Sequence, residues 1–289
     1  MDHCPVCLEV GAEPCTECGR LYHAKCIGQL LERGFDNCQC CFMSFSPTLH
    51  IKAAEYAVEH ENNSPESQVQ LAAALTSAGR ASVALGVLKA IHARAVQSRL
   101  ELKVALHLEL GRAYLNIGQP QLATRELLLV LMLTKMCGYS AFGLPLRAMT
   151  LLTTAYFEQK DYEMVHKIAG ATMRQVHRMN HREAVCIMRV VADTYKAQGY
   201  TDKYRNTLEA ISAIVTEESR DALAKAFVAV ELGVIEHEMG VRSIERLKPA
   251  IRTLRKHKRA IARQACLALQ AQVRASKRLL KKTHPEDVR

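Results

Sequence analysis

The sequence predicts an all-α protein in which antiparallel helix pairs follow a small cysteine-rich module. Hydrophobic residues make up 49% of the 289 residues but aromatic residues only 5%, and Trp is absent. From Ser46 onward Leu and Ala dominate, and apolar residues recur at the helical period. Eight of the eleven cysteines lie in the first 41 residues. This composition argues against a β-sandwich or a large α/β enzyme.

The chain is expected to be intracellular. Its apolar runs fall short of the ~20 residues that span a bilayer, so no membrane partner is expected. The first residues, Met1-Asp2-His3-Cys4, lack the basic and apolar segments of a secretion signal. The expectation is therefore a cytoplasmic or nuclear protein, and the basic clusters described below favour the nucleus.

Cysteine and histidine residues follow a regular spacing between residues 1 and 45. In order they are Cys4-x2-Cys7-x7-Cys15-x2-Cys18-x4-His23-x2-Cys26-x11-Cys38-x2-Cys41. Thiolate sulfur and imidazole nitrogen suit Zn²⁺, and the two-residue spacing lets one tight turn aim two sulfurs at one ion. Eight ligands predict two tetrahedral zinc ions. Metal binding would supply the folding free energy, because a segment of ~45 residues cannot bury a useful core alone.

The module resembles the RING and PHD families of cross-braced zinc fingers, through Cys4-Pro5-Val6-Cys7-Leu8-Glu9 and Cys18-Gly19-Arg20-Leu21-Tyr22-His23-Ala24-Lys25-Cys26. In those families the first and third ligand pairs share one ion, and the second and fourth pairs share the other. The resemblance implies Cys4, Cys7, His23 and Cys26 for site one. For site two it implies Cys15, Cys18, Cys38 and Cys41, with Cys40 as an alternative ligand.

The two families imply different roles. A PHD finger that reads methyl-lysine uses an aromatic cage. The module has no Trp and only Tyr22, Phe35, Phe42 and Phe45 for such a cage, which disfavours a histone-tail reader. In a RING ubiquitin ligase an apolar patch docks the conjugating enzyme, a role that the resemblance gives to Val6 and to Leu30 or Leu31. The Pro inside the last ligand pair and the basic residue after it are missing, because Gln39 and Phe42 stand there. A purely structural zinc knot and a docking module both remain open.

A joining helix is expected at 46–63, followed by five helix pairs at 64–256. Ser64-Pro65-Glu66 is typical of a helix start, with an N-cap, a proline in the first turn and an acid against the dipole. The segment Leu110-Gly111-x2-Tyr114-x3-Gly118-x4-Ala123-x3-Leu127-x2-Val130 resembles the tetratricopeptide repeat. Equivalent small-residue positions are Ala72, Gly111, Thr153, Ala192 and Gly233, which lie 39, 42, 39 and 41 residues apart. The fold predicted is a TPR-like α-solenoid with helices longer than usual.

Solenoids present one face to partners, so the repeats predict protein binding. No Ser-His-Asp order, phosphate loop or paired carboxylate site is present in the sequence, which disfavours an enzyme. Some tetratricopeptide proteins hold a terminal carboxylate with Lys and Asn at fixed positions. The positions after the small residues are Ala73, Arg112, Thr154, Asp193 and Val234, so that clamp is not evident.

The positive charge is concentrated near the carboxyl end. Residues 242–282 carry fourteen Lys/Arg and one acid, whereas residues 1–241 sum to −2. A basic capping helix and tail are expected at 257–289. The basic patch comprises Arg255, Lys256, Lys258, Arg259, Lys277, Arg278, Lys281 and Lys282. Such a patch attracts acidic proteins or nucleic acid, although a solvated capping face explains it equally well.

Three functional hypotheses follow. The first is a zinc-containing scaffold in which the solenoid binds one protein partner and the finger anchors a second. The alternative is a ubiquitin ligase whose solenoid selects the substrate. The third is a chromatin or nucleic-acid-associated subunit that uses the basic end.

Overall fold

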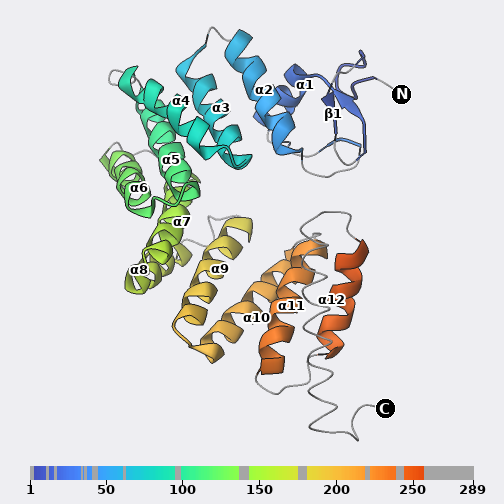
Figure 1. Cartoon of the computed structure of the whole chain (residues 1–289), viewed down its shortest axis with the longest axis vertical. Helices are drawn as coiled ribbons and strands as arrows, with labels where there is room; N and C mark the ends of the chain where they lie inside the picture. Colours follow the sequence, from blue (N-terminus) through green and yellow to red (C-terminus); the bar gives the residue numbers. More distant parts are fainter. Residues whose placement is uncertain are drawn as a thin grey trace, which may run out of the picture. The chain divides into compact units, whose positions relative to one another are not determined.

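The structure is a computed structural model of the whole chain. It describes residues 3–10, 13–15, 18–33, 35, 38–40, 45–60, 63–94, 99–136, 143–174, 181–218, 222–238 and 244–256. The statements below concern these residues. They form the all-α fold of helix pairs that the sequence predicts, and they add one short β-ribbon that it does not (Figure 1).

The elements follow one another in a simple order. The ribbon consists of β1 (Glu13–Pro14) and β2 (Leu21–Tyr22), which pair antiparallel with Glu13 opposite Tyr22. The helices are α1 (Ala24–Glu32), α2 (Pro47–His60), α3 (Pro65–Ser77), α4 (Ala81–Arg94), α5 (Leu100–Asn116), α6 (Pro120–Met136), α7 (Gly143–Glu158), α8 (Tyr162–Met173), α9 (His181–Ala197), α10 (Thr201–Glu218), α11 (Ala222–Glu238) and α12 (Ile244–Lys256). None of these helices is both long and apolar enough to cross a lipid bilayer.

The chain divides into two compact units, residues 1–161 and 162–289. The first unit holds the cysteine-rich module and α1 to α7, and the second holds α8 to α12. In the first unit each helix packs on the next along the chain, and α5 also contacts α3 and α7 (Figure 1). The odd-numbered helices α3, α5 and α7 therefore form one layer. The expected boundaries at 45, 63 and 256 stay predictions.

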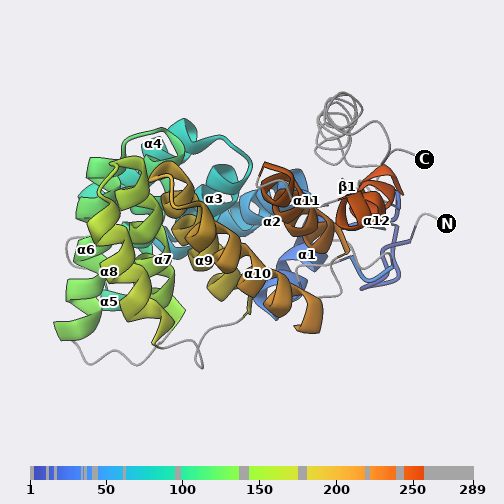
Figure 2. The same cartoon turned by 90° about the horizontal axis from the view of Figure 1, so that it is seen from below.

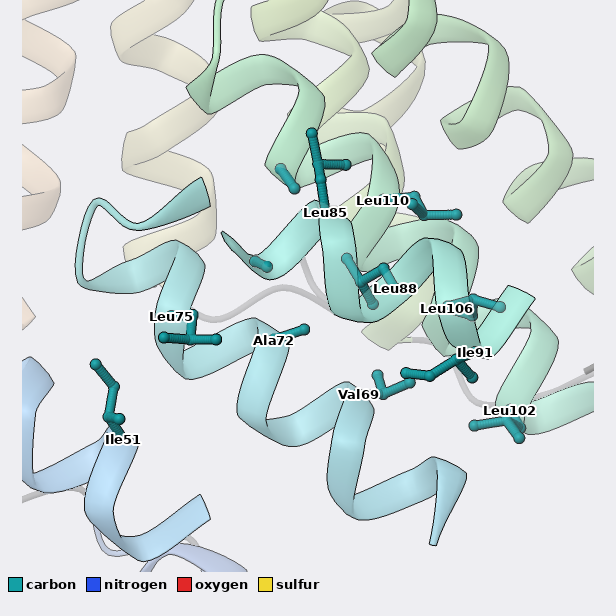
Figure 3. Packing of buried hydrophobic residues seen from close by; sticks show 12 residues of the cluster. Ile51, Val69, Ala72, Leu75, Leu85, Leu88, Ile91, Leu102, Leu106 and Leu110 are labelled. Atoms are coloured by element: carbon teal, nitrogen blue, oxygen red, sulfur yellow. The ribbon is translucent and has the colours of Figure 1, made fainter. Parts of the chain in front are cut away.

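Helix α2 connects the cysteine-rich module to the helix pairs by packing on both. Its Leu49 and Ala53 belong to the buried core of the module, together with Phe45 just before the helix. Its Ile51 belongs to the core of the first helix pairs, and Figure 3 shows it at the edge of a cluster that contains Ala72 and Leu75 of α3. An ion pair between Lys52 and Glu13 also links α2 to β1. The module is thus mounted on the repeats through a helix buried on two sides.

The repeat positions predicted from the sequence are buried where the helices cross. Ala72, Thr153 and Ala192 have no exposed surface, and Gly111 is also buried. At Gly111 a Cβ atom would lie 2.6 Å from Cγ of Leu127 on α6, far inside normal contact. The two helices of this pair can therefore approach as closely as they do only because the residue is glycine.

The turns inside the pairs share one conformation. Gly79, Gly118, Lys160 and Gly199 all have φ between 61° and 77°. After each, the next residue's N–H bonds back to a carbonyl five positions earlier, as from Gln119 to Tyr114 at 2.9 Å. This left-handed turn is a common helix ending, usually made by glycine. The expected N-cap Ser64 also forms, since its Oγ accepts a bond from the Ser67 N–H at 3.1 Å.

In the second unit, α9 packs against α10, α10 against α11 and α11 against α12, and Figures 1 and 2 show α9 and α10 side by side. Gly233 repeats the close approach seen at Gly111, because a Cβ there would lie 2.6 Å from Leu247 Cδ2. The last pair departs from the pattern, with Glu236 buried and an exposed Pro249 inside α12.

Candidate metal centre

The candidate centre begins with two Cys-x2-Cys segments that make the same backbone hydrogen bond. In the first, the Leu8 N–H bonds to the Cys4 carbonyl at 2.9 Å; in the second, the Gly19 N–H bonds to the Cys15 carbonyl at 2.8 Å. Each turn ends on a left-handed residue, Leu8 with φ 66° and Gly19 with φ 71°. The repeated geometry turns both sulfurs of each pair to one side, which is what a shared metal ion requires.

The first group of ligands comprises Cys4, Cys7, His23 and Cys26, whose ligand atoms all lie within 4.8 Å of one another. Strand β2 ends just before His23, and α1 begins just after it and carries Cys26. Cys7 Sγ lies 3.2 Å from His23 Nδ1. The structure therefore brings together the same four residues that the resemblance implies for site one.

The acidities of two thiols in this group diverge. Burial opposes the charged form of Cys4, but the backbone N–H groups of Cys7, His23 and Val6 outweigh it and lower the pKa of that thiol to about 6. Burial and the neighbouring thiols Cys7 and Cys4 raise the pKa of Cys26 to about 12. Without a cation, three thiolates cannot gather here, because each disfavours ionisation of the next. A cation at the centre of the group would remove this conflict.

The second group comprises Cys15, Cys18 and Cys38, again with all sulfurs within 4.8 Å. Cys15 directly follows β1, and Cys38, which comes after α1 in the chain, lies close to Cys15. Cys41, the fourth predicted ligand, lies outside the described residues. Cys40, the alternative ligand, is exposed, and its backbone N–H lies 3.4 Å from Cys38 Sγ. Three of the four expected ligands of site two are thus assembled.

Distances between the ligand atoms fit zinc. With Zn–S bonds of ~2.3 Å, two sulfurs on one tetrahedral ion lie ~3.8 Å apart. The Cys18 and Cys38 sulfurs lie 3.7 Å apart, much farther than the ~2.05 Å of a disulfide. The donor set, thiolates with one imidazole and no carboxylate, also suits zinc rather than magnesium or calcium.

Tyr22 connects the two groups. Its side chain is fully buried, and its ring meets Phe45 edge to face at 5.3 Å. Its hydroxyl lies 3.1 Å from Cys38 Sγ in the second group and accepts a bond from the Gln39 N–H at 3.0 Å. The next residue along the chain is His23, a ligand in the first group. The sequence shows only an aromatic residue beside a histidine, so this role was not predicted.

The residues expected to dock a conjugating enzyme are placed differently from one another. Val6 is 37% exposed, whereas Leu30 is buried in the module core and Leu31 packs partly against it. Leu30 therefore contributes to the core and not to an exposed surface. Leu8, Val10 and Phe35 are more exposed than Val6, at 76%, 66% and 54%. The sequence does carry a signal for Leu8: it stands four residues after Cys4, as Gly19 stands four residues after Cys15.

The predicted basic patch falls mostly beyond the described part of the chain. Arg255 and Lys256 are the last two residues of α12. Lys258, Arg259, Lys277, Arg278, Lys281 and Lys282 lie outside the described residues. The patch stays a prediction from charge.

Comparisons with known proteins identify the fold alone. No protein-family model matches the chain, and no curated protein matches its sequence. A putative kinesin light chain of nearly identical TPR-like repeats from Podosopora anserina is 22% identical, with a TM-score of 0.55 over 68% of this chain and 99% of that one. A variant of that protein is 21% identical, with a TM-score of 0.51 over 76% of this chain and 96% of that one. BtubC (BKLC) from P. vanneervenii is 13% identical, with a TM-score of 0.52 over 79% of this chain and 89% of that one. The array of helix pairs is therefore TPR-like.

Proposed function

We propose that the chain is an adaptor: its helix pairs bind one protein partner, and its N-terminal module, folded around two zinc ions, holds a second. The observation that carries the proposal is the two-sided burial of α2. Leu49 and Ala53 face the core of the module, and Ile51 faces the core of the repeats. A module fixed in this way presents its surface at a constant position relative to the first helix pairs.

The metal has a structural role in this proposal. Four protein ligands would fill site one, and Cys41 would complete site two, so neither ion would keep an open position for substrate. The ions would stabilise the two turns, the ribbon and α1. The proposal therefore assigns no reaction to the centre.

The exposed end of the first turn supports a binding role for the module. A left-handed backbone costs a non-glycine residue ~1 kcal/mol, yet Leu8 occupies it with a side chain that is 76% exposed. Folding gains little from that side chain. Leucine at this position, where the second segment has glycine, points to contact with a partner, and the nearby Val6 and Val10 are exposed as well.

A two-variant experiment tests the adaptor. We expect native mass spectrometry to find two zinc ions in the wild type and in Leu8→Gly, and Leu8→Gly to be at least as stable as the wild type. In quantitative crosslinking from native cells, Leu8→Gly should lose one set of partners and keep those attached to the repeats. Gly19→Ala is the control, because it strains the second turn without removing an exposed apolar side chain. Zero or one zinc ion, or an unchanged partner set in Leu8→Gly, would refute the proposal.

The second candidate is a ubiquitin ligase, favoured by the exposure of Val6 in the first turn. With a panel of conjugating enzymes, the purified chain would then form ubiquitin chains and lose that activity on Val6→Ala. Because Gln39 and Phe42 replace the family's Pro and basic residue, we expect weak activity. Activity that survives both Val6→Ala and chelation would not come from the module.

A further inference from the structure

A row of polar side chains crosses the layer formed by α3, α5 and α7. Arg112 on α5 donates from Nη2 to Ser77 Oγ on α3 at 2.8 Å, and its Nη1 lies 3.5 Å from Glu109 Oε2. Arg147 on α7 interacts with the same Glu109 carboxylate. Asn116 Nδ2 reaches the Thr76 carbonyl at 3.5 Å. Helices α3 and α5 are thus joined by hydrogen-bonding side chains as well as by apolar contact, and Arg147 adds from α7 a charge that acts on the same carboxylate.

The row is short of negative charge. One carboxylate, Glu109, stands among the charges of two guanidinium groups: Arg112 lies 3.5 Å from it, and the charge of Arg147 also acts on it. Its side chain is only 10% exposed, and Oε2 has no hydrogen-bond partner among the described residues. Burial raises the pKa of Glu109 despite Arg112 and Arg147. Both arginines reach solvent, since the Arg112 side chain is 31% exposed and Arg147 is exposed as well.

The second unit has a row of similar type whose charges balance. Glu231 on α11 is two residues before Gly233, as Glu109 is two residues before Gly111. Arg189 on α9 pairs with Glu231, and Asp193 and Lys196 stand nearby. The two negative charges of this row are therefore matched by two positive ones. The surplus of positive charge is therefore a property of the α3, α5 and α7 row.

We propose that Arg112 and Arg147 form the docking site for an acidic segment of a partner protein, whose Asp or Glu carboxylates bridge the two guanidinium groups. This inference rests on the proposed function and names the partner class for the repeats. Guanidinium groups bind carboxylates through paired hydrogen bonds, and Arg112 is held in place before binding by Ser77 and Glu109.

The charge of the chain decides between anionic partners. Nucleic acid binds surfaces with many cations, yet residues 1–241 carry a net charge of −2. The chain's own basic segment, 242–282, carries +13 and would be repelled by the two arginines. Glu158, an exposed acid on α7, is eleven positions from Arg147 and so ~16 Å away along the helix. A short acidic protein segment fits the site best.

The test uses the full chain and a photo-crosslinking peptide of alternating Glu and Ser residues, with mass spectrometry to map the crosslinked positions. At ~150 mM salt, we expect crosslinks on α3, α5 and α7 and a separate set in the basic segment. Arg112→Gln and Arg147→Gln should each lower the first set about ten-fold and leave the second unchanged. Arg125→Gln removes an exposed cation from α6 of the same unit and should change neither set.

Each result has a definite meaning. A Gln/Ser peptide that crosslinks α3, α5 and α7 as well as the Glu/Ser peptide would overturn the proposal, as would an equal loss in Arg125→Gln. Arg147→Gln alters an exposed side chain, so its thermal unfolding should match the wild type, which separates docking from folding. If Arg112→Gln/Arg147→Gln retains every partner that the wild type captures through the repeats, this inference fails and the adaptor function stands. Loss of crosslinks by the double variant but not by Arg125→Gln supports the site.

Discussion

Single glycines decide how closely two helices of a pair approach. At Gly111 an added Cβ would lie 2.6 Å from Leu127 Cγ and 2.8 Å from its Cδ2. We expect Gly111→Ala to lower the free energy of unfolding by about 2 kcal/mol, because a packed interface must open to admit a methyl group.

Gly86 is the matched control: it lies in α4, and a Cβ added there would meet nothing within 4 Å. Gly86→Ala should stabilise by about 1 kcal/mol. Chemical denaturation of both variants checks the pair, and equal effects would contradict the close approach.

Lys160 occupies a left-handed turn that glycine makes in three other places. Its φ of 61° and the bond from the Asp161 N–H to the Tyr156 carbonyl match those of Gly79, Gly118 and Gly199. Lys160→Gly should therefore raise the free energy of unfolding by about 1 kcal/mol, since the strain on Cβ disappears. The same change at exposed Lys167 inside α8 should lower it by a similar amount. A destabilising Lys160→Gly in thermal melts would show that the lysine side chain outweighs the strain.

Residue patterns revealed the repeats because their signal is local. Ala72, Gly111, Thr153 and Ala192 were assigned by aligning the chain on one repeat-like segment, and all four are buried. The exposed Leu8 and the contact of Tyr22 with Cys38 were missed. The exposure of Leu8 depends on which neighbours cover its side chain. The contact of Tyr22 depends on how segments far apart in the chain meet, and no periodic pattern encodes such meetings. The same reason hid the row formed by Arg112, Glu109 and Arg147.

Helix α2 makes the module and the first helix pairs respond to each other. Its Leu49 and Ala53 lie in the same core as Cys15, Cys26 and Cys38. Chelation should unfold the module and speed amide hydrogen exchange across α2, residues 47–60, while α5 and α6 keep their protection.

Two variants sharpen that measurement. Cys4→Ser/Cys7→Ser should reproduce the effect of chelation on α2, and Cys186→Ser, a change at an exposed sulfur of α9, should not. Unchanged exchange in α2 after metal removal would mean that the helix is held by Ile51 and the repeats alone. The joining helix was predicted from the sequence, but its two buried faces were not, because Ala-rich segments give little contrast between faces.

Across the whole chain, charge is divided unevenly: 242–282 carries +13 and 1–241 carries −2. We expect a salt-sensitive interaction at the basic patch. Reversal of Arg255, Lys256, Lys258 and Arg259 to Glu should weaken the binding of duplex DNA roughly equally for all sequences and flatten its salt dependence, because phosphate contacts carry no base information. If the chain binds no DNA at ~50 mM salt but the reversal releases a protein, the acidic-partner hypothesis holds instead. If neither DNA binding nor partner binding changes, the basic residues only form a solvated surface at the end of the array.

In the zinc-dependent adaptor that we propose, the double burial of α2 would also link metal supply to solubility. An array of repeats exposes apolar side chains wherever its terminal helix is lost. Ile51 of α2 shares a buried cluster with Val69 and Leu75 of α3, and these side chains form the apolar edge that α2 covers. Starving the chain of metal would loosen α2 and uncover that edge, so molecules would associate with one another as concentration rises. In a cell, shortage of the ion would then remove the protein as aggregate, and its abundance would follow the ion's availability.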